Sequence, residues 1–106
     1  MNIQYKKGVL DLLVLSMLDK KDQYGYDISD TLSLKISLSP GTVYPILRKL
    51  KDDGLVTTYL SETSGGPARK YYKITQSGKQ KLIESKAEWV DFVKITLEIL
   101  EVYKDE

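Results

Sequence analysis

The sequence of 106 residues contains no cysteine and no histidine. Without cysteine it forms no disulfide framework, which agrees with a reducing compartment. It also lacks the sulfur and nitrogen ligands that zinc and other transition metals prefer, so we predict no metal site and no cofactor. An enzyme would have to use serine, lysine, tyrosine or carboxylate groups. No constellation of these groups occurs at a workable spacing, and we predict that the protein is not an enzyme.

Long apolar runs are also absent. No run approaches the roughly 20 residues that cross a bilayer, and the N-terminus lacks the basic-then-apolar pattern of a secretion signal. We therefore expect a cytoplasmic protein with no membrane partner. Apolar residues make up 42% of the chain and charged residues 29%, which is typical of a single globular domain rather than a disordered chain.

The formal net charge of +1 hides an uneven distribution. Residues 1–33 carry −1 and residues 82–106 carry −4, whereas residues 34–81 hold nine cations and three acids, giving +6. Phosphate contacts supply much of a protein's affinity for DNA. The central block is where such contacts are expected, although ordinary clustering can also produce a block of this size.

The stretch from Ser39 to Gly54, SPGTVYPILRKLKDDG, predicts a capped helix. The Ser39 hydroxyl is expected to cap it, a proline follows at the first helical position, and Gly54 can take the left-handed conformation that ends a helix. The apolar residues at helical spacing are Val43, Ile46, Leu47 and Leu50. The opposite face carries Thr42, Tyr44, Arg48, Lys49 and Lys51. Such a helix suits the DNA major groove, but a cationic outer face is more often simply solvated.

A β-hairpin is predicted after this helix. The runs at 56–59 and 71–74 are rich in β-branched and aromatic residues, and a loop at 65–67 separates them. Arg69 and Lys70 lie at the base or the tip of this hairpin. Residues 35–38 alternate in polarity and are expected to add a short third strand.

Two further helices are expected before the capped helix. The apolar run at 9–18 predicts a mostly buried first helix, and residues 19–23 form a polar connection. Residues 24–34 predict a second helix with Ile28 and Leu32 facing inward. Its outward residues are expected to be Asp27, Ser29 and Asp30.

This order of elements is that of a winged helix-turn-helix, a mainly α fold with a small β-hairpin wing. The segments YGYDI (24–28), SPGTVYPILRKLKDDGLV (39–56) and RKYYKIT (69–75) resemble the signature of PadR-type transcriptional regulators. The resemblance runs from about Val9 to the end of the chain. Room for one helix after the wing is similar to the compact subfamily with a single C-terminal dimerisation helix.

The resemblance implies a dimeric regulator that binds double-stranded DNA at a palindromic operator and represses a nearby operon, with multidrug or aromatic compounds as one form of signal. The residues expected to contact DNA are Tyr24, Ser39, Thr42, Tyr44, Arg48, Lys49, Gly65, Gly66, Arg69 and Lys70. Arg48 is the only residue of the helix able to make a bidentate contact to guanine. Tyr24 can offer its hydroxyl to phosphate, whereas Tyr26 is at least as well explained as filling the core edge. The alternative function is a winged-helix protein-interaction module, which would not need cations beside the glycine loop.

The C-terminal segment predicts a long helix from about Gln76 to Lys104, capped by Thr75 or Ser77. At 1.5 Å per residue it would be roughly 45 Å long. Its polar residues form one stripe, and apolar residues cover far more than the arc of about 100° that a surface helix buries. We therefore predict a homodimer, with residues 1–75 as the DNA-binding domain and 76–106 as the dimerisation helix. The interface residues are expected to be Val90, Val93, Leu97, Leu100 and Tyr103. The alternative is a helix that folds back over the first helix and needs no partner.

Trp89, the sole tryptophan, falls on this helix. Large aromatic residues dominate buried interfaces, so its simplest role is an interface anchor. In some compact PadR-like regulators, tryptophans at this position flank a pore at the dimer interface and stack on planar, often cationic compounds. The resemblance therefore implies a site for a planar hydrophobic effector at Trp89 and Val93.

Overall fold

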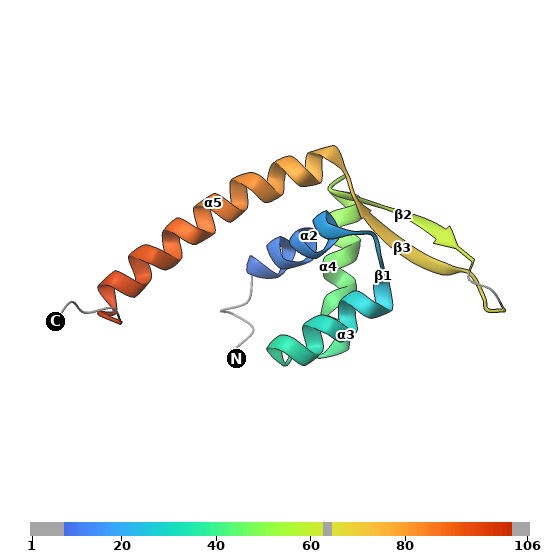
Figure 1. Ribbon diagram of the computed structural model, residues 1–106, viewed down its shortest axis with the longest axis horizontal. Helices are drawn as coiled ribbons and strands as arrows, with labels where there is room; N and C mark the ends of the chain where they lie inside the picture. Colours follow the sequence, from blue (N-terminus) through green and yellow to red (C-terminus); the bar gives the residue numbers. More distant parts are fainter. Residues whose placement is uncertain (1–7, 63–64, 103–106) are drawn as a thin grey trace.

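The computed structural model describes residues 8–62 and 65–102. Along the chain the elements are α2 (Val9–Lys20), β1 (Gln23–Tyr24), α3 (Gly25–Ile36), α4 (Pro40–Asp52), β2 (Val56–Ser61), β3 (Arg69–Ile74) and α5 (Gln76–Ile99). Helices α2, α3 and α4 form a compact body, from which the β2–β3 hairpin and α5 extend in opposite directions (Figure 1). The fold is a winged helix-turn-helix with a long C-terminal helix, as predicted.

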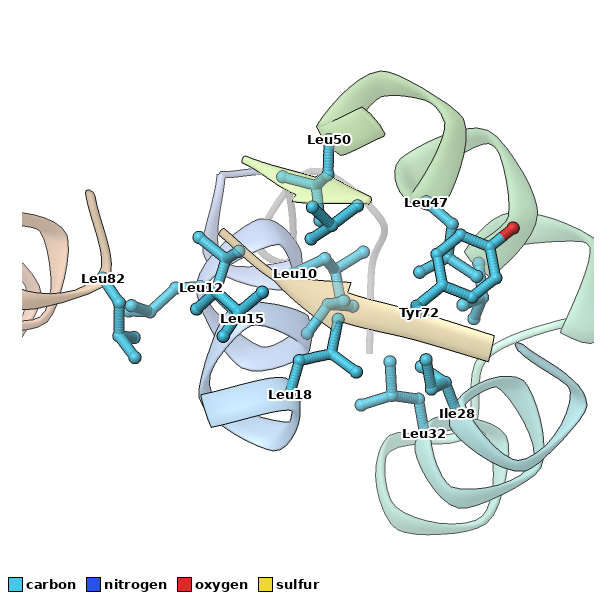
Figure 2. Packing of buried hydrophobic residues seen from close by; sticks show 14 of the residues in the cluster. Leu10, Leu12, Leu15, Leu18, Ile28, Leu32, Leu47, Leu50, Tyr72 and Leu82 are labelled. Carbon is cyan, nitrogen blue, oxygen red and sulfur yellow. The ribbon is translucent and has the colours of Figure 1, made fainter. Parts of the chain in front are cut away.

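One apolar core joins the four helices with β2 and β3, except the far parts of the hairpin and of α5 (Figure 2). The most deeply buried side chains are Val14, Leu15, Leu18, Ile28, Val43, Leu47 and Leu50. Three of these residues lie on α4, with Ile46 half-buried beside them. Because the core fixes this face of α4, the opposite face is held toward solvent.

Both ends of α4 lie where the sequence placed them, with Ser39 as the N-cap residue and a proline at the first helical position, but the predicted capping bond of the Ser39 hydroxyl does not form. Gly54 has φ 75°, and the N–H of Leu55 donates to the carbonyl of Leu50 (2.9 Å), which is the Schellman arrangement that ends many helices. Ser39 is the N-cap residue, but its hydroxyl makes no capping hydrogen bond. The N–H of Thr42 donates instead to the Ser39 backbone carbonyl (2.9 Å).

The third strand of the sheet is not where the sequence placed it. The sheet is antiparallel with the order β1-β3-β2, and β1 consists of Gln23 and Tyr24. Residues 35–38 are not a strand, because α3 continues to Ile36 and the chain then reverses at Ser37 (φ 54°). This reversal lets both Ile36 and Leu38 reach the core, which explains their alternation without a strand.

Two residues of α3 differ from expectation. Ser29, predicted to face outward, is buried with 3% of its surface exposed, on the side of α3 that lies against α4. Tyr26 does not fill the core edge, since 59% of its surface is exposed. The inward placement of Ile28 and Leu32 is confirmed.

The hairpin and α5 are joined by a tight network around Thr75. The Thr75 hydroxyl accepts from the N–H of Gly78 (3.0 Å) and donates to the Gly54 carbonyl (2.7 Å), while the Thr75 N–H donates to the Leu55 carbonyl (3.0 Å). Thr75, not Ser77, is therefore the N-cap of α5. These bonds tie the start of α5 to the turn that follows α4.

Helix α5 is shorter than predicted. It ends at Ile99, so its length is about 36 Å, and Glu101 takes a left-handed conformation (φ 58°). The N–H of Val102 donates to the Leu97 carbonyl (3.1 Å) and the N–H of Glu101 to that of Glu98 (3.0 Å). This Schellman motif ends the helix without glycine. Lys104, the predicted end, lies outside the described residues.

Candidate nucleic-acid interface

Helix α4 presents Tyr44 and Arg48 on its exposed face. The two residues are four apart and therefore neighbours on one side of the helix. Thr42 is half-buried and Ser39 is exposed just before the first turn. Pro45 lies inside the helix and is itself exposed. The core contacts of Val43, Leu47 and Leu50 thus place an aromatic and a guanidinium group together in solvent.

Strand β3 contributes to the same face through Tyr72 and Lys70. Tyr72 is buried, and burial raises the pKa of its hydroxyl, while the positive charge of Arg48 acts in the opposite direction. The Lys70 Nζ lies 5.8 Å from the centre of the Tyr72 ring, within the range of a cation–π contact. Arg48 and Lys70, from different elements, therefore flank one tyrosine.

Gly25 brings the start of α3 against this group. A Cβ atom added at Gly25 would lie 3.0 Å from the Tyr72 ring and 3.8 Å from the Tyr44 ring. The absence of a side chain at Gly25, the glycine of the YGY motif, thus leaves room for the Tyr72 ring against the backbone of α3, whereas the Tyr44 ring is at ordinary contact distance. Tyr44, Arg48, Lys70 and Tyr72 are hereafter called the front face.

Lys49, predicted to contact DNA, is engaged elsewhere. Its Nζ lies 2.7 Å from Oδ2 of Asp11 on α2. The hydrogen bond to Asp11, together with the charge of that carboxylate, raises the pKa of Lys49. The structure therefore turns this ammonium group toward α2, whereas the neighbouring Arg48 lies on the front face.

The two cations of the hairpin lie on opposite sides of the sheet. Successive residues of a strand point to opposite faces, so Lys70 shares the side of Tyr72 while Arg69 shares the side of Tyr71. The Arg69 guanidinium carbon lies 5.0 Å from the centre of the Tyr24 ring. Tyr24 and Arg69, both predicted DNA contacts, are thus brought together, but away from the front face.

The loop of the hairpin joins Ser61 to Arg69, so the two cations lie at the loop end of the wing. Gly65 and Gly66 are exposed, and Gly65 has φ 80°, a conformation that glycine adopts without strain. Residues 63–64 lie outside the described part of the chain.

Sequence reasoning missed the roles of Tyr72, Gly25 and Asp11. The alternation of RKYY carries a usable signal, because period-two spacing already assigns Lys70 and Tyr72 to one face. The pairing of Asp11 with Lys49 joins residues 38 positions apart, which no local pattern encodes.

Helix α5 lies along its own domain as far as Trp89 and Phe92, which share a hollow with the start of α2. Leu82 is buried in the core, whereas Val90 and Leu100 are exposed and Val93 and Leu97 half-buried. The fold-back alternative therefore fails to cover the apolar residues in the second half of the helix, which projects away from the body (Figure 1). Tyr103 lies outside the described residues.

Trp89 lines a hollow of about 340 Å³ between α5 and the start of α2. The Trp89 and Phe92 rings are 6.0 Å apart, centre to centre. Glu88 and Ser85 supply the polar groups of the hollow, and Val9 and Leu12 add apolar surface. Val93, predicted to share this site, is not among the lining residues.

Among residues 8–62 and 65–102, no helix combines the length and the apolar character needed to cross a membrane. In the same ranges, no three acidic side chains gather in a way that could hold a metal ion.

Residues 14–84, well over half of the chain, match the transcriptional regulator PadR-like family. A PadR family transcription regulator from Clostridium difficile R20291 has a similar structure, with 37% identity and a TM-score of 0.79, covering 88% of this chain and 99% of that one. A PadR-like transcriptional regulator from Bacillus cereus is 34% identical and has a TM-score of 0.81. The match covers 95% of this chain and 99% of that one.

A curated relative, the negative transcriptional regulator PadR of Bacillus subtilis, is 33% identical over 78 residues, which cover 70% of this chain. The match spans 43% of that relative, so this chain corresponds to less than half of its length. The matched family and structures are transcriptional regulators and not enzymes. The chain therefore belongs to the PadR-like family of transcriptional regulators.

Proposed function

We propose that this regulator binds double-stranded DNA as a homodimer and represses a nearby operon from a palindromic operator. The observation that supports DNA binding is the front face, where Arg48 of α4 and Lys70 of β3 flank Tyr72. A helix with an exposed guanidinium fits the major groove, and a neighbouring wing reaches the phosphate backbone. Such a protein acts in the cytoplasm, where its DNA lies.

The dimer is supported by the apolar surface of α5. Residues 76–106 serve as the dimerisation helix of a DNA-binding domain formed by residues 1–75. Exposed Val90 and Leu100, with half-buried Val93 and Leu97, form a stripe that a second copy would cover. A twofold axis lets the same stripe cover itself and presents two front faces to the two half-sites of a palindrome.

The test of this function is the salt dependence of duplex binding. Purified protein is titrated by fluorescence anisotropy with pooled genomic fragments and then with a selected operator, at a series of salt concentrations. We expect the logarithm of the binding constant to fall linearly with the logarithm of the salt concentration, because phosphate contacts release counterions. A protein-interaction module would show no salt-sensitive attachment to any duplex, and this outcome would overturn the proposal.

Arg48→Ala is expected to weaken binding to the selected operator by about 1–3 kcal/mol, because it removes the bidentate contact to guanine. Lys49→Ala is the matched control. It deletes a cation one position along the same helix, but one that is paired with Asp11. Its effect on operator affinity should be smaller, and it should not change which base is preferred. An unaltered affinity in Arg48→Ala would remove Arg48 from the interface.

The hollow beside Trp89 is proposed to bind planar, hydrophobic and cationic effectors that release DNA. Two aromatic rings and the Glu88 carboxylate supply stacking and a countercharge. Stacking on an indole ring is worth about 0.5–1.5 kcal/mol beyond area burial. Val93, half-buried on the same helix, would complete the site only in the dimer.

Because Trp89 is the only tryptophan, its fluorescence reports this site directly. We expect planar cationic compounds to quench the emission and to lower operator affinity. Glu88→Gln should weaken binding of the cationic compounds several-fold while leaving neutral analogues unaffected. Emission that stays constant throughout a titration with both kinds of compound would exclude the site.

A further inference from the structure

The Tyr24 ring lies on the side of the sheet opposite the core and is held in place by neighbouring aromatic rings. Tyr24 ends β1 and pairs with Tyr71 of β3. The centre of its ring lies 6.1 Å from that of Tyr71 and 6.1 Å from that of Tyr26. With a neighbouring ring on two sides and only partial exposure, the Tyr24 side chain has little freedom to move.

Neighbouring rings form a row of four tyrosines in the order Tyr26, Tyr24, Tyr71 and Tyr59, and this row is also held at the Tyr59 end. The Tyr59 and Tyr71 rings stack, with centres 5.7 Å apart and an angle of 17° between their planes. The Tyr59 hydroxyl donates to Oδ2 of Asp22 (2.7 Å), and this hydrogen bond raises the pKa of Tyr59. Because Asp22 immediately precedes β1, the bond ties β2 to the segment that carries Tyr24.

The Arg69 guanidinium group stacks on the Tyr24 ring. Strand β1 stops opposite Tyr71, so Arg69, two residues nearer the loop, has no neighbouring strand on that edge. Its guanidinium carbon lies 5.0 Å from the centre of the Tyr24 ring. No carboxylate forms an ion pair with Arg69 within the described ranges 8–62 and 65–102. Its charge thus stays available to an external anion.

We propose that Tyr24 is a positioning residue for Arg69, whose guanidinium then contacts a backbone phosphate at the edge of the wing. This inference rests on the proposed DNA-binding function, and it gives the Tyr24 ring a positioning role in place of the direct phosphate contact that the resemblance implies for its hydroxyl. A long side chain loses rotamer freedom when it binds. A guanidinium already stacked on an aromatic face loses less of it, which favours the contact.

The test compares variants of both residues in the full chain, titrated with a nonspecific DNA duplex over a series of salt concentrations. Arg69→Ala should lower the salt slope by about 0.9, the value for one lost phosphate contact. Tyr24→Leu removes the ring and should reduce the slope equally, with a similar several-fold loss of affinity. Tyr24→Phe keeps the ring and should behave as the parent. Should Tyr24→Leu not fold, Tyr24→Ile replaces it, because a β-branched residue suits the strand.

The combined variant Tyr24→Leu/Arg69→Ala separates positioning from independent contacts. If Tyr24 acts through Arg69, the double variant binds no more weakly than Arg69→Ala alone. Additive losses would overturn the inference, as would a Tyr24→Phe variant that binds as weakly as Tyr24→Leu, because the hydroxyl would then contact DNA itself. A parent protein without salt-sensitive binding would instead overturn the proposed function, and the inference with it.

Discussion

Gly78→Ala is expected to lower the free energy of unfolding by about 2–4 kcal/mol, through overpacking and loss of the capping bonds that depend on this turn. A Cβ atom added at Gly78 would lie 2.1 Å from the Leu55 carbonyl oxygen and 2.7 Å from Cγ1 of Ile74. The carbonyl belongs to the backbone and also accepts from the Thr75 N–H, so it cannot move aside alone. The steric cost must therefore exceed the roughly 1 kcal/mol that alanine gains over glycine inside a helix.

Gly41→Ala is the matched control for this substitution. Gly41 is also helical, but a Cβ atom there would meet nothing closer than the Ser39 hydroxyl at 3.9 Å. Helix propensity alone should act, and stability should rise by up to about 1 kcal/mol. Urea denaturation followed by circular dichroism measures both changes. Two variants with the same sign of effect would contradict the close approach of α5 to Leu55.

The position of Gly78 also matters for the arrangement of the two halves of the molecule. The network of Thr75 with Gly54 and Leu55 sets the angle at which α5 leaves the body. In a dimer joined through α5, this angle would also determine the distance between the two front faces. A strained junction would then weaken operator binding even in the fraction of molecules that stay folded.

Local signals explain what the sequence could predict. The helix between Ser39 and Gly54 has a left-handed glycine at its end and an apolar face at helical spacing, and the hairpin has β-branched runs around a glycine loop. Both are present with nearly the predicted bounds. Period-two alternation along the predicted hairpin strand also separates Arg69 from Lys70.

Features that depend on distant residues could not be predicted in this way. Strand β1 is two residues long, too short for any alternation to show, and it exists because β3 offers a free edge. In the sequence Gly78 is an ordinary glycine in the first turn of a helix. A glycine is needed there because the Leu55 carbonyl leaves no space for a side chain. Ser29 is buried where α3 lies against α4. In each case the determining partner lies far away in the sequence.

Val90→Asp is expected to turn the proposed dimer into a monomer. Val90 is 50% exposed on α5, where it shares a shallow hollow with Ile83, Lys86 and Lys94. In a symmetric dimer the substitution brings two carboxylates into the interface and removes them from water. Each of these costs several kcal/mol. Loss of the second half-site contact should then reduce operator affinity by about 100-fold or more. Light scattering after size exclusion measures the mass, and anisotropy measures the affinity.

Ile95→Asp provides a control of the same chemistry on the same helix. Ile95 is 45% exposed but lies about 140° around the helix from Val90, next to Asp91 and Glu98 on one side and to exposed Phe92 and Ile99 on the other. An aspartate there should remain solvated, so both mass and operator affinity should stay those of the parent. Dissociation by both substitutions would place the interface around the whole helix, and dissociation by neither would exclude α5 as the dimer interface. An interface along Val90, Val93 and Leu97 requires that Val90→Asp dissociates the dimer and that Ile95→Asp leaves it intact.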